Sequence, residues 1–181
     1  MPQCAAQIIN LLQADASRMA ALKAVSKLEL PDCWLAAGFI RNMVWDAMHG
    51  YSGTPLNDHD VIFYDPDGER GEMARVAEER LRADLPGQNW QVRNQALMHS
   101  RNGDTPYRHS ADAMSFWPEI ETAVGARLNT KGKLELLAPF GTESLFVGHI
   151  THNPKRPYAL FISRVTSKKW LQHWSKLRIV A

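Results

Sequence analysis

The 181-residue sequence has few cysteines, no long apolar run and little net charge. Its two cysteines, Cys4 and Cys33, lack the spacing of metal ligands, so we expect reduced thiols. The sequence has no stretch of about 20 apolar residues that could span a bilayer, and we expect no membrane partner. It also lacks a signal-peptide pattern, which favours a cytoplasmic protein. A net charge of +2 neither requires nor excludes a nucleic-acid partner.

What the sequence does contain suits one globular domain. Apolar residues make up 45% of the chain, which is enough to build a sizeable core. The length fits a single domain over 1–181. We expect a helical extension at 1–30, a core at 34–155 and a basic, aromatic tail at 156–181.

Helical and strand-like patterns alternate through the core. Apolar stripes predict helices within 1–30, over 39–48 and over 69–83. Short apolar or alternating runs predict strands. We expect a polar loop at 100–105 and a short helix that Ser110 caps and Pro118 ends. This order predicts an α/β or α+β fold, with a mixed central β-sheet flanked by helices. The expected strands lie at 34–37, 58–64, 90–93, 122–128 and 134–137, the last two joined as a hairpin.

Asp58 and Asp60 give the sharpest chemical signal. Residues two apart in a strand share a face, with Cα atoms about 6.6 Å apart. Two carboxylates so placed can bind a shared pair of Mg²⁺ ions, whose charge offsets their mutual repulsion. His59 would point to the opposite face. The alternative is a solvated turn before the strand.

Gly38 and Arg41 give a second signal. Gly38 lies where a predicted strand passes into a helix, so backbone N–H groups there can face an anion. Arg41 falls in the first helical turn, where the helix dipole disfavours a cation unless a phosphate lies between. The alternative for Arg41 is a surface side chain. One turn later, Trp45 could cover a base, although packing against the sheet is the simpler interpretation.

Together, Gly38, Arg41 and the Asp58-x-Asp60 pair resemble the DNA polymerase β-like nucleotidyltransferases. The sequence is also similar to a subgroup of small bacterial nucleotidyltransferase-like proteins with no determined substrate. The resemblance implies an NTP substrate, an unknown acceptor, and Mg²⁺ or Mn²⁺ held by the two aspartates. It further implies that Gly38, Arg41 and Arg93 contact nucleotide phosphates. The segments that carry this likeness are 37–42, 45–46, 58–65, 92–96, 98–99, 117–118 and 138–141.

The sequence also departs from this pattern. Gly38 is followed by Phe39 in place of the usual serine, which removes a phosphate-contacting hydroxyl. The family's third carboxylate acts as a general base, but segment 90–94 offers no acid where one is expected. Glu135 is the best substitute by position and residue type; the alternative is an exposed strand residue. Arg93 belongs to a basic segment that can receive an acceptor or a phosphate, or can simply be solvated.

The expected function is therefore metal-dependent transfer of a nucleoside monophosphate from an NTP to an unidentified acceptor. One alternative is a catalytically silent domain that binds nucleotides or proteins. Another is a metal-dependent phosphohydrolase, which would need the His59-Asp60 doublet on a helix. In the tail, Trp170 and Trp174 lie one helical turn apart among basic residues. Nucleic-acid binding would use such a pattern, but docking of a terminal helix is favoured.

Overall fold

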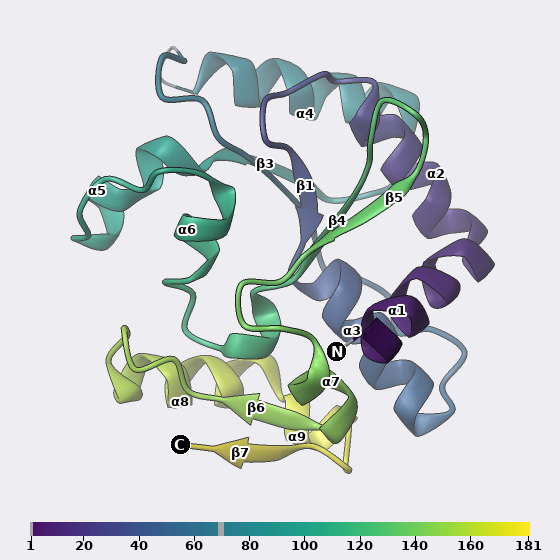
Figure 1. The fold of residues 1–181 in the computed structure, drawn as a ribbon, viewed down its shortest axis with the longest axis vertical. Coiled ribbons are helices and arrows are strands. Elements are labelled where there is room, and N and C mark those ends of the chain that lie inside the picture. The colour runs from purple at the N-terminus through teal and green to yellow at the C-terminus, as the bar shows by residue number, and fades with distance from the viewer. Residues whose placement is uncertain (1, 69–70) are drawn as a thin grey trace.

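The computed structural model describes residues 2–68 and 71–181 (Figure 1). The described chain forms two β-sheets with helices around them. The strands are β1 (Trp34–Ala36), β2 (His59–Phe63), β3 (Trp90–Asn94), β4 (Gly125–Leu128), β5 (Leu134–Leu137), β6 (His149–Thr151) and β7 (Arg178–Val180). The α-helices are α1 (Pro2–Ala14), α2 (Ala16–Ser26), α3 (Gly38–His49), α4 (Glu72–Asp84), α5 (Met98–Asn102), α6 (Ser110–Met114), α7 (Glu143–Val147), α8 (Tyr158–Lys168) and α9 (Trp170–His173), with short 3₁₀ helices η1 (Gln95–Leu97) and η2 (Ile120–Thr122).

The larger sheet has five strands in the order β3-β2-β1-β4-β5. β2 and β3 are parallel and are joined through α4, whereas β1 pairs antiparallel with both β2 and β4, and β4 with β5. The sheet is therefore mixed, as the sequence predicts. β4 approaches β1 closely at Gly125, where an added Cβ would lie 3.3 Å from the Leu35 carbonyl oxygen. β6 and β7 form a separate parallel pair.

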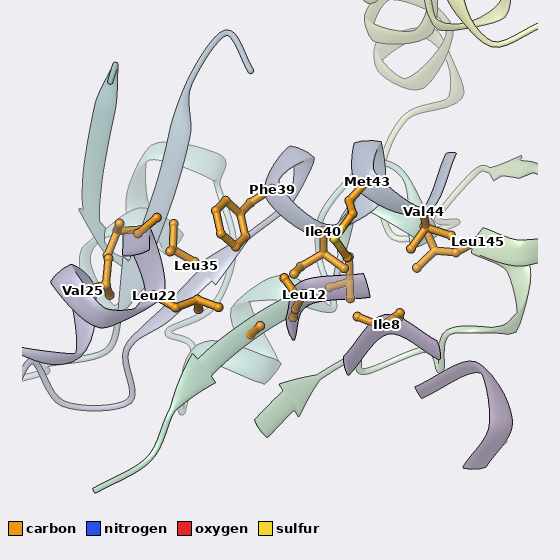
Figure 2. Close-up of a cluster of buried hydrophobic side chains, with 14 of the residues drawn as sticks. Ile8, Leu12, Leu22, Val25, Leu35, Phe39, Ile40, Met43, Val44 and Leu145 are labelled. Carbon is orange, nitrogen blue, oxygen red and sulfur yellow. The ribbon is translucent and has the colours of Figure 1, made fainter. Parts of the chain in front are cut away.

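One face of this sheet is covered by the helices α1 to α4. Strand alternation directs Leu35, Val61 and Val92 to that face, where they join the main core. Figure 2 shows Ile8 and Leu12 of α1 packed among Ile40, Val44 and the neighbouring side chains, with Leu145 of α7 at one end. The helical N-terminal extension thus helps to close the core. Two helices form it in the described residues, as the apolar stripes predict.

The opposite face of the sheet carries a smaller apolar cluster and an open space. Trp34, Ala36 and Ile62 pack there against Met114 of α6. Figure 1 shows α5 and α6 beside this part of the sheet, with α8, α9 and the β6–β7 pair gathered at one end of the molecule. On this second face a cleft is lined by Asp60 of β2, by Gln91 and Arg93 of β3, and by residues of the C-terminal elements.

Several predicted boundaries need correction. Asp58 precedes β2, which begins at His59, and α5 occupies part of the predicted loop 100–105. Ser110 does not cap α6: His109 does, because its Nδ1 accepts the Asp112 N–H at 3.1 Å. Strand β4 begins at Gly125, since η2 precedes it. The predicted start of the 69–83 helix lies outside the described residues, and α4 is helical from Glu72.

Candidate active site

A cleft of about 920 Å³ opens on the polar face of the larger sheet. One wall comes from the β1–α3 turn, the segment before β2, and β3. The other comes from α8 and α9. We call it the central cleft. Its charged lining residues are Asp58, Asp60, Arg41, Arg93, Arg156, Arg164, Lys168 and Lys169.

The turn between β1 and α3 has an unusual backbone. Ala37 has φ 57° and ψ −123°, a region that favours glycine, and costs of about 1–3 kcal/mol are typical for such conformations. In the first turn of α3, the N–H groups of Ile40 and Arg41 donate to the Ala37 carbonyl oxygen at 3.1 and 3.0 Å, whereas those of Gly38 and Phe39 make no hydrogen bond within the described chain. An added Cβ on Gly38 would lie 3.4 Å from Arg41 Nη2 and 3.6 Å from Asn42 Oδ1. The turn thus presents a helix N-terminus and a guanidinium side by side in the cleft, which suits an anion.

Arg41 is a buried cation, 7% exposed, so the surface alternative for this side chain is wrong. Its Nη1 donates to Thr122 Oγ1 at 2.7 Å, and its Nε and Nη2 donate to Asn42 Oδ1 at 3.2 and 3.0 Å. Burial lowers the pKa of Arg41 to about 10. Among the described residues it has no ion-pair partner, since the nearby Glu119 pairs with Arg164 at 2.5 Å. A buried guanidinium without a carboxylate partner favours an anionic ligand.

Asp58 and Asp60 both line the central cleft. Burial, and then the charge of Asp58, raise the pKa of Asp60 to about 6. Neither carboxylate forms a hydrogen bond or ion pair with another part of the described chain. Two partly buried carboxylates without internal partners are hard oxygen ligands that fit Mg²⁺ or Mn²⁺.

His59 points away from the cleft. It packs between Phe39 and Trp90, with ring centroids 6.0 and 4.9 Å away, and burial lowers its pKa. His59 and Asp60 are neighbours in strand β2, so their side chains face opposite sides of the sheet. They cannot share a metal ion. The phosphohydrolase alternative, which needs this doublet on a helix, is therefore wrong.

The C-terminal wall of the cleft was not predicted from the sequence. Leu160, Arg164 and Lys168 lie four residues apart along α8 and form one row on the cleft side. Trp170 and Trp174 are buried against Trp45, with ring centroids 5.6 and 5.2 Å away. The preferred interpretation of the paired tryptophans as helix docking is confirmed. Trp45 is buried by packing, but its ring partners are these two tryptophans of the C-terminal segment.

Comparison with known proteins agrees with this geometry. A family model described as Nucleotidyltransferase matches residues 23–179. The chain belongs to the nucleotidyltransferase family. It is also similar to a protein whose NMR structure is described as revealing a CCA-adding enzyme head domain. The two chains are 34% identical, the match covers 96% of this chain and 94% of the other, and the TM-score is 0.83. No curated protein matches the chain.

The fold brings together most of the predicted site residues of this nucleotidyltransferase. Gly38, Arg41, Asp58, Asp60 and Arg93 all line the central cleft, although they come from three separate segments of the sequence.

Within the part of the chain that the structure describes, no helix is long and apolar enough to cross a membrane.

Glu135 does not join these residues, and this prediction needs correction. It lies on β5, and β1 and β4 separate β5 from β2. Neighbouring strands are about 4.8 Å apart, so Glu135 is roughly 14 Å or more from Asp60. Its carboxylate accepts hydrogen bonds from Asn129 Nδ2 at 2.9 Å and from Arg127 Nε at 2.8 Å, which lower its pKa. Glu135 therefore takes part in the β4–β5 hairpin.

Gln91 stands beside Asp60, at a position that the sequence left without a role. The parallel pairing of β2 and β3 sets Asp60 against Gln91 and Ile62 against Arg93. Both β3 residues line the central cleft, and Arg93 Nη2 donates to Gln91 Oε1 at 2.8 Å. Among the described residues, no group of three His, Cys, Asp or Glu side chains could hold a metal ion.

Proposed function

We propose that this nucleotidyltransferase transfers a nucleoside monophosphate from an NTP to an acceptor. The observation that carries the proposal is the pair of unpartnered carboxylates, Asp58 and Asp60, next to the N-terminus of α3 and the buried guanidinium of Arg41. The carboxylates attract cations and the helix N-terminus attracts phosphate. A metal–nucleotide complex presents both charges to one site.

In this proposal Asp58 and Asp60 hold Mg²⁺ or Mn²⁺. When bound, the cation neutralises phosphate charge and stabilises the transition state of the displacement. Gly38 and the first turn of α3 contact the β- and γ-phosphates, and Arg41 lies beside them. The positive charges of Arg41 and Lys168, which already act on Asp60, would then also face the phosphates.

Arg41 stabilises the leaving pyrophosphate in this arrangement. Its hydrogen bonds to Thr122 and Asn42 fix the guanidinium before any ligand arrives, and preorganised donors of this kind stabilise developing charge most effectively. The similar CCA-adding enzyme head domain supports nucleotidyl transfer as the reaction.

A transfer assay tests the proposal. The protein is incubated with NTPs labelled at the α-phosphate, with Mg²⁺ and with cell extract, and the extract is then searched for a labelled acceptor. Asp58→Asn and Asp60→Asn should each abolish labelling and Mg²⁺-dependent NTP binding measured by calorimetry. Asp84→Asn, at the exposed end of α4 and away from the cleft, is the matched control. Unchanged NTP binding in both site variants would reject the proposal.

A second candidate is nucleotide binding without transfer. It is favoured by the missing group of three metal-binding side chains in the described residues. The same measurements separate the two candidates. A silent domain would bind NTP with Mg²⁺ in an Asp58-dependent manner but would label no acceptor.

A further inference from the structure

The order of the strands places different chemical groups on the two sides of Asp60 in the central cleft. β2, which carries Asp60, lies between β1 and β3. The β1–α3 turn with Gly38 and Arg41 is on one side of Asp60, and Gln91 of β3 is directly opposite Asp60 on the other side. In an in-line displacement, the leaving group and the attacking group lie on opposite sides of the phosphorus atom. If pyrophosphate leaves towards Arg41, the acceptor must attack from the side of β3.

The polar groups that β3 places on this side are hydrogen-bond donors. Arg93 is exposed and has no ion-pair partner in the described part of the chain. Gln91 Oε1 already accepts from Arg93, which leaves the amide N–H groups of Gln91 to face the cleft. Neither a guanidinium nor an amide can remove a proton at neutral pH. This side of the cleft thus offers positive charge and N–H donors.

The other arginine at this end of the cleft is already neutralised. Arg156 forms a bidentate ion pair with Asp104, and its Nη1 lies 2.9 Å from Asp104 Oδ1. Arg156 also donates to the Phe116 carbonyl oxygen, which fixes its orientation. Of these two arginines, Arg93 is therefore the one that remains available to an acceptor entering past β3.

We propose that the acceptor presents an anionic oxygen, of a phosphate monoester or a carboxylate, which Arg93 and Gln91 hold for attack. This inference rests on the proposed function. The acceptor oxygen forms a bond to the α-phosphorus, and the bond from that phosphorus to the oxygen bridging to the β-phosphate breaks. The electron pair leaves with pyrophosphate. An acceptor that is already ionised has no proton to lose, so the step needs no general base, and the product is a phosphoanhydride or an acyl phosphate anhydride.

A hydroxyl acceptor fits this side of the cleft less well. An alcohol must lose its proton during attack, and a positioned base contributes typically 10²–10⁴-fold to such a step. Gln91 occupies the place across from Asp60 from which a carboxylate would serve that role. The guanidinium of Arg93 would attract an anionic acceptor from solution but adds little for a neutral one.

The chemical linkage in the labelled product tests the inference. The acceptor is labelled with NTPs carrying ³²P at the α-position, with Mg²⁺ and cell extract, and scaled-up product is examined by ³¹P NMR and treated with neutral hydroxylamine. A phosphoanhydride shows coupling between two phosphorus nuclei, and an acyl phosphate is cleaved by hydroxylamine. Either result supports the inference and also identifies the source of the anion. A phosphodiester, which shows neither property, would overturn the inference and leave the proposed function intact, whereas absence of any labelled product would count against the proposed function itself.

Two substitutions on β3 provide an independent readout. Arg93→Gln should raise the KM for the acceptor by about tenfold or more, because a charge-assisted hydrogen bond is lost, and should raise the KM for NTP less. Arg101→Gln, on the exposed surface of α5 and outside the cleft lining, is the matched control and should change neither value. Gln91→Glu should slow transfer by about tenfold through repulsion of the anionic acceptor. Faster transfer in Gln91→Glu would mean that the acceptor needs a base, and would contradict the inference.

Discussion

The guanidinium of Arg41 lies 4.3 Å from the centroid of the Trp170 ring and 5.2 Å from that of Trp45. Arg41 and Trp45 belong to α3, whereas Trp170 begins α9 near the other end of the chain. The C-terminal segment therefore forms part of the site that the sheet and α3 begin. The ring of Trp170 lies against the guanidinium of Arg41 and excludes solvent from that side.

Replacing Trp170 separates this ring contact from simple packing. Trp170→Phe keeps an aromatic face for Arg41, while Trp170→Leu keeps an apolar side chain without one. A desolvated cation–π contact contributes about 2 kcal/mol, so loss of the aromatic face should weaken Mg²⁺-dependent NTP binding by about tenfold or more in the leucine variant. We expect the phenylalanine variant to bind within about threefold of the original protein, measured by calorimetry.

Both Trp170 variants lose part of a buried side chain, and each should cost about 3 kcal/mol or less of stability. Their melting temperatures provide the necessary control, because comparable unfolding with different NTP affinities isolates the contact with Arg41. Equal NTP affinities for the two variants would show that the aromatic face does not position Arg41.

Gly38→Ala tests the anion-binding role of the β1–α3 turn. The added Cβ would meet Arg41 Nη2 at 3.4 Å, an ordinary van der Waals contact, so the variant should fold with little change in stability. The same methyl group would occupy space that a phosphate needs to approach the helix N-terminus. We expect NTP affinity to fall by roughly tenfold and the melting temperature to change by less than about 3 °C. Unaltered NTP binding would place the triphosphate elsewhere in the cleft.

Local pattern was sufficient to predict the sheet-side wall of the site. The alternation of polar and apolar residues around Asp60 fixes which side chains share a face of β2, because strand geometry has a period of two. Gly38 and Arg41 were predicted because a glycine at a strand-to-helix change and a cation in the first turn are both local features. These residues lie in the central cleft as expected.

Contacts between distant segments could not be predicted in the same way. Gln91 becomes a neighbour of Asp60 through the register of β2 and β3, which depends on the α4 crossover and the whole core. Thr122 and Trp170 reach Arg41 only through tertiary packing. The incorrect prediction for Glu135 has a related cause. Alternation identifies the face of a strand, but it does not state how many strands separate two residues.

Asp60 should make the ligand-free protein less stable at neutral pH. Its pKa is about 6 in the folded chain against 3.8 in the reference state. A raised carboxyl pKa favours folding below pH 4, and this contribution is lost as the pH rises through about 6. Allowing for partial exposure, ionised Asp60 costs about 1–2 kcal/mol at pH 7. Asp60→Asn should therefore raise the melting temperature by about 3–6 °C at pH 7 and by much less at pH 4.

Addition of Mg²⁺ should reverse the order of the melting temperatures of the original protein and Asp60→Asn. The cation offsets the charge of Asp58 and Asp60, so it should raise the melting temperature of the original protein but not that of Asp60→Asn. Asp84→Asn, outside the cleft, should respond to Mg²⁺ like the original protein. If Asp60→Asn is less stable than the original protein at pH 7 without metal, then ionised Asp60 does not destabilise the folded protein, and the prediction is wrong.

Asp46 joins the segment before Asp58 to the C-terminal wall. Its buried carboxylate accepts the Thr54 N–H at 2.7 Å, the Thr54 hydroxyl at 2.6 Å and the Trp174 indole N–H at 2.8 Å. The substitution Asp46→Asn would turn an amide NH₂ group towards one of these donors. Because an unsatisfied buried donor costs about 1–3 kcal/mol, this variant should weaken the attachment of both Thr54 and Trp174 to α3.

Hydrogen exchange measures the effect of Asp46→Asn directly. We expect faster exchange in 51–57 and in 170–177, with the amides of α1 unchanged, since α1 packs against the side of α3 that carries Ile40 and Val44. Thr54→Val removes a hydroxyl that contacts both Asp46 Oδ1 at 2.6 Å and His173 Nε2 at 2.7 Å, but it leaves the Trp174 bond to Asp46 intact. It should therefore accelerate exchange in 170–177 less than Asp46→Asn does. If Asp46→Asn accelerates exchange equally along the whole chain, the substitution lowers global stability and Asp46 does not specifically couple the two segments. A selective change would instead mean that the segment leading to Asp58 and the wall carrying Trp170 open as one unit. In that case Asp46→Asn should also weaken Mg²⁺-dependent NTP binding.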